Sequence, residues 1–119
     1  MKDVTELQAW KTGIELVKEI YLLTKSFPRE ELYGLTSQIK KSSESILANI
    51  AEGFGRYTYA DKANKYVIAR GECSETFAHL SVAVALQFLP SNKASQAFDL
   101  LLLEKKLLSG LVAACKERS

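Results

Sequence analysis

Few residues in this 119-residue chain have the type and spacing that catalysis or metal binding requires. The one histidine, His79, stands four positions after Glu75, whereas di-metal sites in helical bundles use Glu-x-x-His pairs, in which the separation is three. No serine or cysteine has a histidine placed as its base. Gly53 and Gly55 follow an expected helix and not a strand, which argues against a nucleotide-binding loop. We therefore expect a protein that is not an enzyme and that uses no metal and no cofactor.

Nucleic-acid binding is the stronger chemical option. Between positions 40 and 70, six basic residues stand against three acidic ones, although the net charge of the whole chain is only +2. Repeated around an oligomer, such a cluster would form a basic belt whose affinity for nucleic acid falls steeply with salt. Tyrosines between the basic residues could stack on unpaired bases. The hypothetical binding set is Lys40, Lys41, Arg56, Lys62, Lys65, Arg70, Tyr57 and Tyr59.

Ordinary solvated surfaces carry clusters of this kind as well, so a second interpretation stays open. In this alternative the protein is an interaction scaffold that binds another protein and neither RNA nor DNA. Both interpretations depend on the arrangement of helices that positions these residues.

Four helices are expected, over residues of about 5–27, 35–54, 59–89 and 94–116. A capping box of Thr5 and Gln8 opens the first helix, and Pro28 ends it. Its apolar stripe is Leu7, Trp10, Ile14, Val17 and Tyr21. Thr58 and Asp61 give the third helix a similar start, and no stretch shows the sustained alternation of a strand. The expected fold is all-α, a single-domain four-helix bundle with up-down-up-down topology.

The second helix ends in a stretch that we interpret as a structural motif, made of Asn49, Glu52, Gly53 and Gly55. Its apolar row is Leu35, Ile39, Ile46 and Ile50, with the small Ser42 and Ser43 between them. Glu52 and Arg56 are spaced for an ion pair, and Gly53 or Gly55 is expected to supply a left-handed residue that closes the helix. Asn49 is expected to bond to another helix or to the loop after Gly53.

On the third helix, Arg70 falls on the expected apolar stripe of Tyr66, Cys73, Phe77, Leu80, Val84 and Phe88. It must extend to an edge of the bundle or pair with a carboxylate, and Glu44 and Glu52 are the candidates.

Apolar residues occupy two sides of the later helices. The inner row of the fourth helix is Ala97, Leu101, Leu108, Val112 and Cys115. A second set lies outside the expected bundle core, and large exposed apolar patches mark interaction sites. We therefore expect a homo-oligomer, with an interface that includes Val82, Leu86, Leu89, Leu100, Leu103 and Leu107. The alternative is that one long helix is simply central in the bundle.

Composition places the chain among ordinary globular proteins, with 47% hydrophobic and 25% charged residues. The N-terminal residues lack the apolar segment of a signal peptide, and no apolar run is long enough for a membrane span. Cys73 and Cys115 lack the spacing of a redox or zinc motif, so we expect two buried thiols in the reducing cytoplasm.

Two sequence blocks, Tyr33-Gly34-Leu35-Thr36-Ser37-Gln38 and the run from Ser45 to Arg56 that contains Asn-Ile-Ala-Glu-Gly-Phe-Gly-Arg, carry a resemblance to a known family. They resemble the signature of the bacterial 23S rRNA intervening-sequence proteins, also called four-helix bundle proteins. The resemblance covers roughly residues 5–90. It implies a four-helix bundle that assembles into a pentameric ring. The family is also similar to the accessory protein of diversity-generating retroelements, which implies nucleic acid and a reverse transcriptase as partners.

The chain departs from the family pattern at several positions. Leu47 stands where relatives usually have proline, and Lys41-Ser42 stands where they have Arg-Ala. Glu72 replaces a frequent serine, and the start of the third helix is less basic than in relatives. These departures leave the expected fold unchanged and weaken the nucleic-acid role that the resemblance implies.

Overall fold

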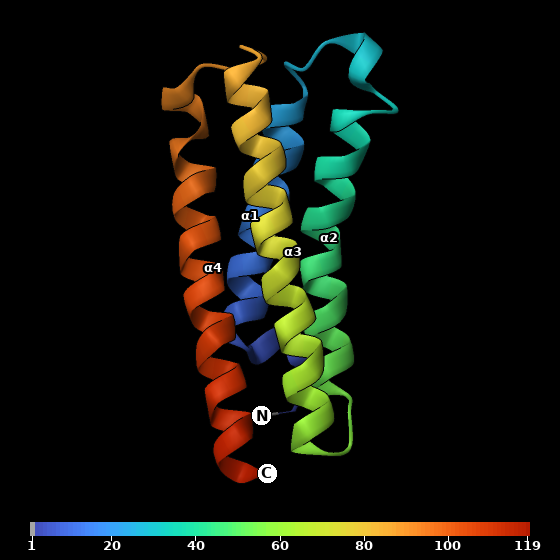
Figure 1. Ribbon diagram of the computed structural model, residues 1–119, viewed down its shortest axis with the longest axis vertical. Coiled ribbons are helices and arrows are strands. Elements are labelled where there is room, and N and C mark those ends of the chain that lie inside the picture. The colour runs from blue at the N-terminus through green and yellow to red at the C-terminus, as the bar shows by residue number, and fades with distance from the viewer. Residues whose placement is uncertain (1) are drawn as a thin grey trace.

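The computed structural model describes residues 2–119 and contains four long α-helices with no strand in that range. The helices are α1 (Gln8–Thr24), α2 (Leu35–Phe54), α3 (Tyr59–Ala85) and α4 (Ser91–Arg118). Short 3-10 turns over Val4–Glu6 and Arg29–Glu31 precede α1 and α2. Consecutive helices run in opposite directions along a body of 45 × 25 × 21 Å (Figure 1).

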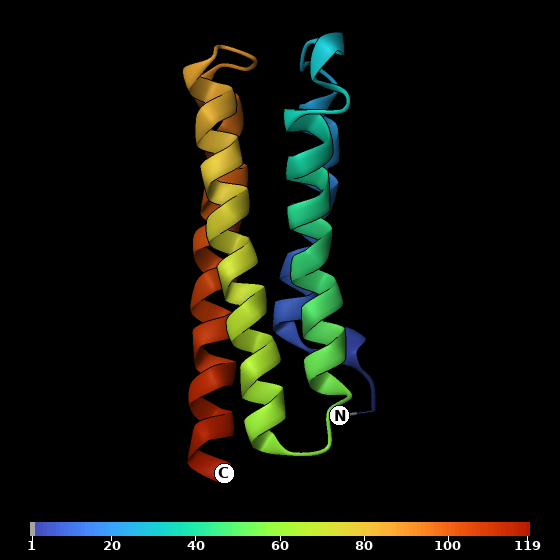
Figure 2. The same ribbon diagram turned by 45° about the vertical axis from the view of Figure 1, so that its right-hand side comes forward.

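The four helices pack as a square, because each contacts its neighbours in sequence and α1 also contacts α4. Turning the molecule shows the pair α1–α2 beside the pair α3–α4 (Figure 2). The core lies between them and includes Leu16, Ile46, Leu80 and Leu108, all fully buried. The all-α architecture expected from the sequence is confirmed, and its antiparallel helices are those of a four-helix bundle.

The start of α1 differs from the expectation. Asp3, and not Thr5, caps the first turn, because its carboxylate accepts a hydrogen bond from the Thr5 amide. That turn is a 3-10 helix, and α1 begins only at Gln8. The predicted capping box of Thr5 and Gln8 is therefore wrong.

α1 also ends earlier than Pro28 would require, at Thr24. The amides of Lys25, Ser26 and Phe27 donate to carbonyls three residues back, which is the 3-10 pattern that often ends an α-helix. Phe27 then packs on Phe88 of the α3–α4 connection, with ring centroids 5.7 Å apart. Pro28 then begins the connection to α2, as the N-cap of the 3-10 turn Arg29–Glu31.

The buried face of α1 is rotated from the predicted stripe towards smaller residues. Its buried positions are Ala9, Thr12, Gly13, Leu16, Ile20 and Thr24. Trp10 is half-buried, and Tyr21 is exposed beneath the ammonium of Lys40, which lies 4.7 Å from its ring centroid. Small side chains allow α1 to approach its neighbours closely. We infer that this close approach explains why α1 buries its face of small residues and not the predicted stripe of large apolar residues.

α2 and α3 follow the sequence more closely. Ser42 and Ser43 are buried in the core row of α2, and the hydroxyl of Ser42 bonds that of Thr76 on α3 at 2.8 Å. Thr58 caps α3 as expected, since its side chain accepts from the Asp61 amide. Phe77 is the exception on α3, because it is exposed and Thr76 takes its place in the core.

The ends of α2 and α3 both differ from the expectation, and the left-handed glycine predicted for the end of α2 is wrong. α2 closes at Gly55 with φ −83°, and no described glycine has a positive φ. α3 was expected to reach residue 89 but stops at Ala85 because Gln87 adopts φ 63°. The amides of Gln87 and Phe88 bond to Val84 and Ala83 carbonyls respectively, which is a Schellman closure.

Gln87→Gly should therefore stabilise the protein. A left-handed residue with a Cβ costs ~1 kcal/mol, and glycine removes that cost, so thermal unfolding should shift upward by a few degrees. The control is Gln96→Gly on α4, where glycine lies within an exposed helical segment and should lower stability by ~1 kcal/mol. A fall in melting temperature for Gln87→Gly would contradict this account of the α3 end.

Candidate functional site

The predicted basic set divides between the two ends of α2. Lys40 and Lys41 lie near its start, and Arg56 and Tyr57 follow its end. About 20 Å of helix separates the two groups, at 1.5 Å per residue. Lys40 and Lys41 line a shallow cavity with the α1–α2 connection, which also includes the acid Glu44. The bundle therefore spreads the sequence cluster along its length and does not gather it on one spot.

Two of the central lysines have structural partners. Lys62 donates to the carbonyls of Phe54 at 2.6 Å and Gly53 at 3.5 Å, so it neutralises the C-terminal end of α2. Lys65 forms an ion pair with Glu52 at 2.8 Å, and this hydrogen bond lowers the pKa of the Glu52 carboxyl. Both ammonium groups are thus directed towards the protein's own acceptors.

Arg70 reaches neither predicted carboxylate. Its guanidinium donates to the Ser109 hydroxyl on α4 at 3.3 Å, so the expected pairing with Glu44 or Glu52 is wrong. Tyr59 is also engaged, because Arg118 donates to its hydroxyl and lies over its ring. Tyr59 is 38% exposed despite these contacts, Arg56 is exposed, and Tyr57 is 97% exposed.

The motif of Asn49, Glu52, Gly53 and Gly55 lies at the end of α2, where its residues make contacts within the bundle. Gly53 gives Tyr66 room, since a Cβ there would lie 2.7 Å from the tyrosine ring. Glu52 pairs with Lys65 and not with Arg56, which corrects the predicted ion pair. Asn49 bonds within its own helix, to the Ser45 carbonyl and hydroxyl, and so the expected link to another helix is wrong.

The predicted outer apolar surface is partly confirmed as exposed. Leu86 is 56% and Leu103 44% exposed, and Val82 is exposed too. Leu89 is only 3% exposed, because the early end of α3 lets the chain fold it into the core, so its assignment to the interface is wrong. Leu100 and Leu107 are half-buried and pack against the core.

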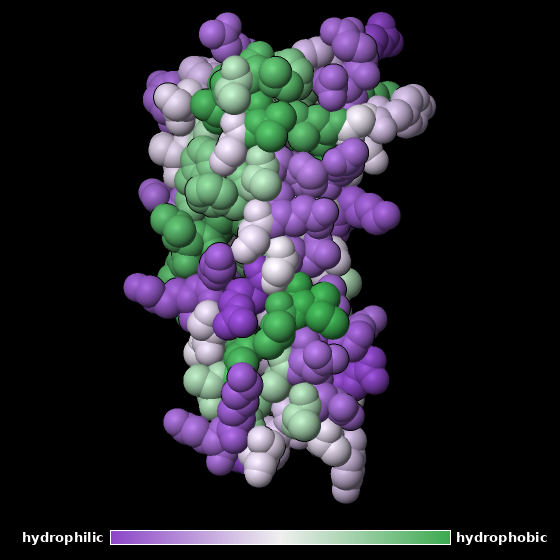
Figure 3. Space-filling model, viewed as in Figure 1, coloured by the Kyte–Doolittle hydropathy of each residue, from purple (hydrophilic) through white to green (hydrophobic). Residues whose placement is uncertain are grey.

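We call the exposed large apolar residues in the second half of α3, at its C-cap and in the first half of α4 the α3–α4 apolar surface; they are Phe77, Val82, Leu86, Leu102 and Leu103. Figure 3 shows apolar side chains gathered over the upper parts of these two helices, with hydrophilic side chains over α2. Phe77 was expected in the core, and Leu102 was not among the predicted interface residues, so neither was predicted to be part of this surface.

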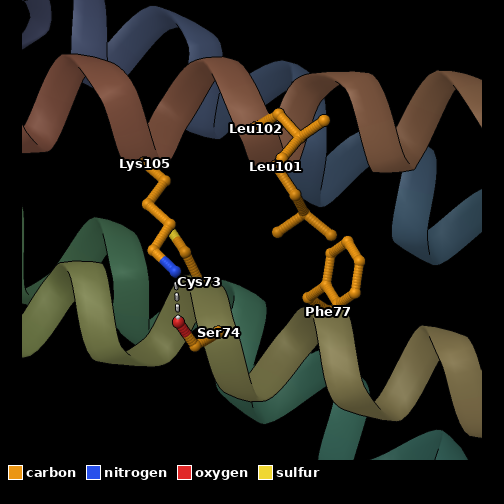
Figure 4. Close-up of a pocket in the computed structure, with 6 residues that line it drawn as sticks. All are labelled: Cys73, Ser74, Phe77, Leu101, Leu102 and Lys105. Atoms are coloured by element: carbon orange, nitrogen blue, oxygen red, sulfur yellow. Dashed lines mark hydrogen bonds between the residues drawn. The ribbon is translucent and has the colours of Figure 1, made fainter.

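A groove of about 310 Å³ lies between α3 and α4 at this surface. Phe77 and Leu101 point towards each other across it, and Lys105 reaches from α4 to the Ser74 hydroxyl at 3.0 Å (Figure 4). Phe77 also meets Phe98 edge to face, with centroids 5.0 Å apart. The groove is apolar with one cationic end.

A second, polar cavity of about 360 Å³ lies between α2 and α3. Its lining includes Lys41, Glu72, Glu75 and His79. Partial burial raises the pKa of Glu72, and its hydrogen bond and charge contact with Glu75 raise it further. His79 lies 3.9 Å from Glu75 within the same helix. The cavity is lined mainly by polar side chains. Among the described residues, no group of three His, Cys, Asp or Glu is placed to hold a metal ion.

The most unusual polar residue is Glu104, which the sequence analysis missed. It occupies the inner row of α4 between Leu101 and Leu108 and is fully buried at 0% exposure. Neither of its oxygens has a hydrogen-bond partner among residues 2–119. Burial raises its pKa to about 8. Glu104 lies three residues after Leu101 and four before Leu108, so helical spacing already placed it on the buried face of α4. It was not predicted to be buried because its side chain is charged.

The described helices include none that is long and apolar enough to cross a membrane.

The chain matches one protein-family model and is similar in fold to a solved structure. The family model described as 23S rRNA-intervening sequence protein matches residues 5–110. The structure is similar to a 1.70 Å crystal structure from Bacteroides thetaiotaomicron VPI-5482, of a protein with unknown function from the S23 ribosomal protein family. The two are 26% identical with a TM-score of 0.80, and the similarity covers 87% of this chain and 97% of that one. No curated protein matches the chain.

Replacing the buried acid gives a prediction about stability. Glu104 has a pKa of about 8 in the folded chain and an ordinary value of 4.5, so folding takes up a proton between these values. Wild-type stability should fall as the pH rises from 4.5 to 8 and then level off, a loss of at most ~5 kcal/mol. Glu104→Gln should remove this slope and be more stable than wild type at pH 8.5, as measured by urea unfolding. Parallel pH profiles for the two proteins would contradict the assignment.

Proposed function

Because the chain belongs to the 23S rRNA-intervening sequence protein family, we propose that it is a non-enzymatic binding protein that works as a homo-oligomer. Its subunits associate through the α3–α4 apolar surface. The resemblance identified from the sequence blocks around Tyr33 and Asn49 is confirmed by the family match over residues 5–110.

The observation that carries this proposal is the exposure of large apolar side chains where the bundle does not need them. The core is already filled from all four helices, yet Leu86, Leu102 and Leu103 remain about half exposed, at 56%, 60% and 44%. Covering such side chains contributes roughly 25 cal/mol per Å² of apolar area removed from water. A surface of this kind on a small protein is typical of an association site.

The family resemblance implies that the oligomer is a ring. When each subunit contacts the next through two different patches, the assembly closes into a ring if the rotation from one subunit to the next is a whole-number fraction of 360°. Five copies would place five equivalent α2–α3 ends around one axis. We therefore extend the proposal to a pentamer.

Glutamate at the proposed interface tests assembly. Leu86→Glu and Leu103→Glu should each reduce the mass in solution from a multiple of 13.2 kDa towards the single-chain value, because association would bury an unpaired charge. Leu32→Glu, at a half-exposed leucine in the α1–α2 connection, is the matched control and should leave the mass unchanged. Light scattering after size exclusion measures all four proteins. A wild type that is already monomeric at high micromolar concentration would overturn the proposal.

RNA or DNA binding is the second candidate, and one observation favours it. Tyr57 is almost completely exposed beside the exposed Arg56 at the α2–α3 connection. An aromatic ring with a neighbouring cation is a typical element of single-strand binding, where a stacked base contributes ~1–3 kcal/mol. The ion pair of Lys65 with Glu52 offsets one positive charge near this end, and the Lys62 ammonium is directed to the end of α2.

A mobility-shift titration with single-stranded and structured RNA tests this second candidate. Tyr57→Ala and Arg56→Glu should each weaken binding at least fivefold at 50 mM salt, since they remove the stacking ring and a phosphate contact. Lys25→Glu, an exposed lysine outside the predicted set, is the charge control. Absence of binding by wild type at low salt would remove this candidate and leave the oligomeric scaffold intact.

A further inference from the structure

α1 is attached to the bundle differently from the other helices. α2 and α3 are joined by the Ser42–Thr76 hydrogen bond and the Glu52–Lys65 ion pair. α3 and α4 are joined by hydrogen bonds from Arg70 and Lys105. From Gln8 to Thr24, the polar side-chain contacts with another helix involve Tyr21, whose ring lies under the Lys40 ammonium and whose pKa is raised by burial and by a hydrogen bond to Glu44 of α2. α1 is therefore attached chiefly by apolar packing.

One point of that packing lies at the buried Glu104. Gly13 of α1 lies against the carboxyl group, and a Cβ added to this glycine would lie 2.7 Å from Glu104 Oε2 and 2.6 Å from Leu47 Cδ2. A glycine within a helix costs roughly 0.5–1 kcal/mol relative to alanine. Here the missing side chain provides the space that the carboxyl group occupies, so the two residues are matched to each other.

The surroundings of this carboxyl group contain little that could stabilise a negative charge. α1 presents Gly13 and α2 presents Leu47. α3 presents Cys73, whose thiol pKa is raised to about 12 by burial and, to a lesser extent, by Glu104 itself. On α4, the neighbouring Lys105 directs its ammonium outward to Ser74. An ionised Glu104 can thus be solvated only if a helix moves away.

We propose that Glu104 and Gly13 form a proton-dependent contact that holds α1 on the bundle while the carboxyl group is neutral and releases α1 when it ionises. α1 is the helix that moves, because the polar side-chain contacts that its release breaks are those of the exposed Tyr21. Moving α2, α3 or α4 breaks a hydrogen bond between helices that is at least partly buried. Release of α1 also uncovers the carboxyl group directly, since Gly13 covers it without a side chain.

The size of the effect follows from proton linkage. If the closed state holds its proton up to about pH 8 and the open state releases it near 4.5, the opening constant rises about tenfold per pH unit between these values. From pH 6 to pH 8 the same relation gives roughly a 50-fold increase, because the slope flattens near the upper value.

Native-state hydrogen exchange read by mass spectrometry tests the proposal. After correction for the intrinsic pH dependence of exchange, protection of α1 amides should fall roughly 50-fold from pH 6 to pH 8 and should remain below that of α2 and α3 amides, which exchange only when the whole chain unfolds. Trp10, the only tryptophan, is half-buried on α1, so its emission should shift to longer wavelength over the same range.

Three variants make the test specific. Glu104→Gln should abolish the pH dependence of α1 protection. Glu72→Gln removes another carboxyl group of raised pKa, from the α2–α3 cavity, and should leave that dependence intact. Gly13→Ala should expose α1 at both pH values, because the new methyl group displaces the carboxyl group.

Three outcomes would overturn the proposal. They are an unchanged α1 protection in wild type, α1 amides that are as well protected at pH 8 as those of α2 and α3, and the same loss in Glu104→Gln. Because α1 carries none of the α3–α4 apolar surface, the result does not depend on whether the protein assembles.

Discussion

Close approach of helix backbones at small residues is the constraint on which this bundle depends. α1 contributes Ala9, Thr12 and Gly13 to the core, and α2 contributes Ser42 and Ser43. Interiors are packed to crystal-like density, so short side chains bring the helix axes nearer and leave the remaining leucines and isoleucines to fill the rest. The face that each helix buries, the position of Glu104 and the exposure of the outer leucines all follow from this spacing.

Periodicity was a good guide where the core row was both apolar and large. The row of Ile39, Ile46 and Ile50 on α2 is fully buried, and the inner row of α4 is buried as expected. The Thr58 cap was also predictable, because a hydroxyl that accepts from the third residue along is a local interaction. In each case the sequence pattern and the packed structure require the same residue type.

Tertiary packing decided the features that sequence reasoning missed. The α1 stripe was predicted from large residues, whereas the close contact with α4 selected small ones. Gln87 takes a conformation usually given to glycine because Phe88 and Leu89 must turn inward. The basic cluster was compact only in sequence: folding separates Lys40 from Arg56 and pairs Lys65 with Glu52. Partners of polar side chains on different helices cannot be read from spacing alone.

The fit between Gly13 and Glu104 also limits the order in which this sequence can change over generations. An alanine at position 13 would collide with the carboxyl group, whereas a shorter residue at 104 would leave only a small void. Amino-acid substitutions at these two sites should therefore occur in a fixed order, in which Glu104 is replaced first and Gly13 afterwards. A lineage that keeps the glutamate is bound to keep the glycine, so one buried acid preserves a residue on a helix more than ninety positions away in the chain.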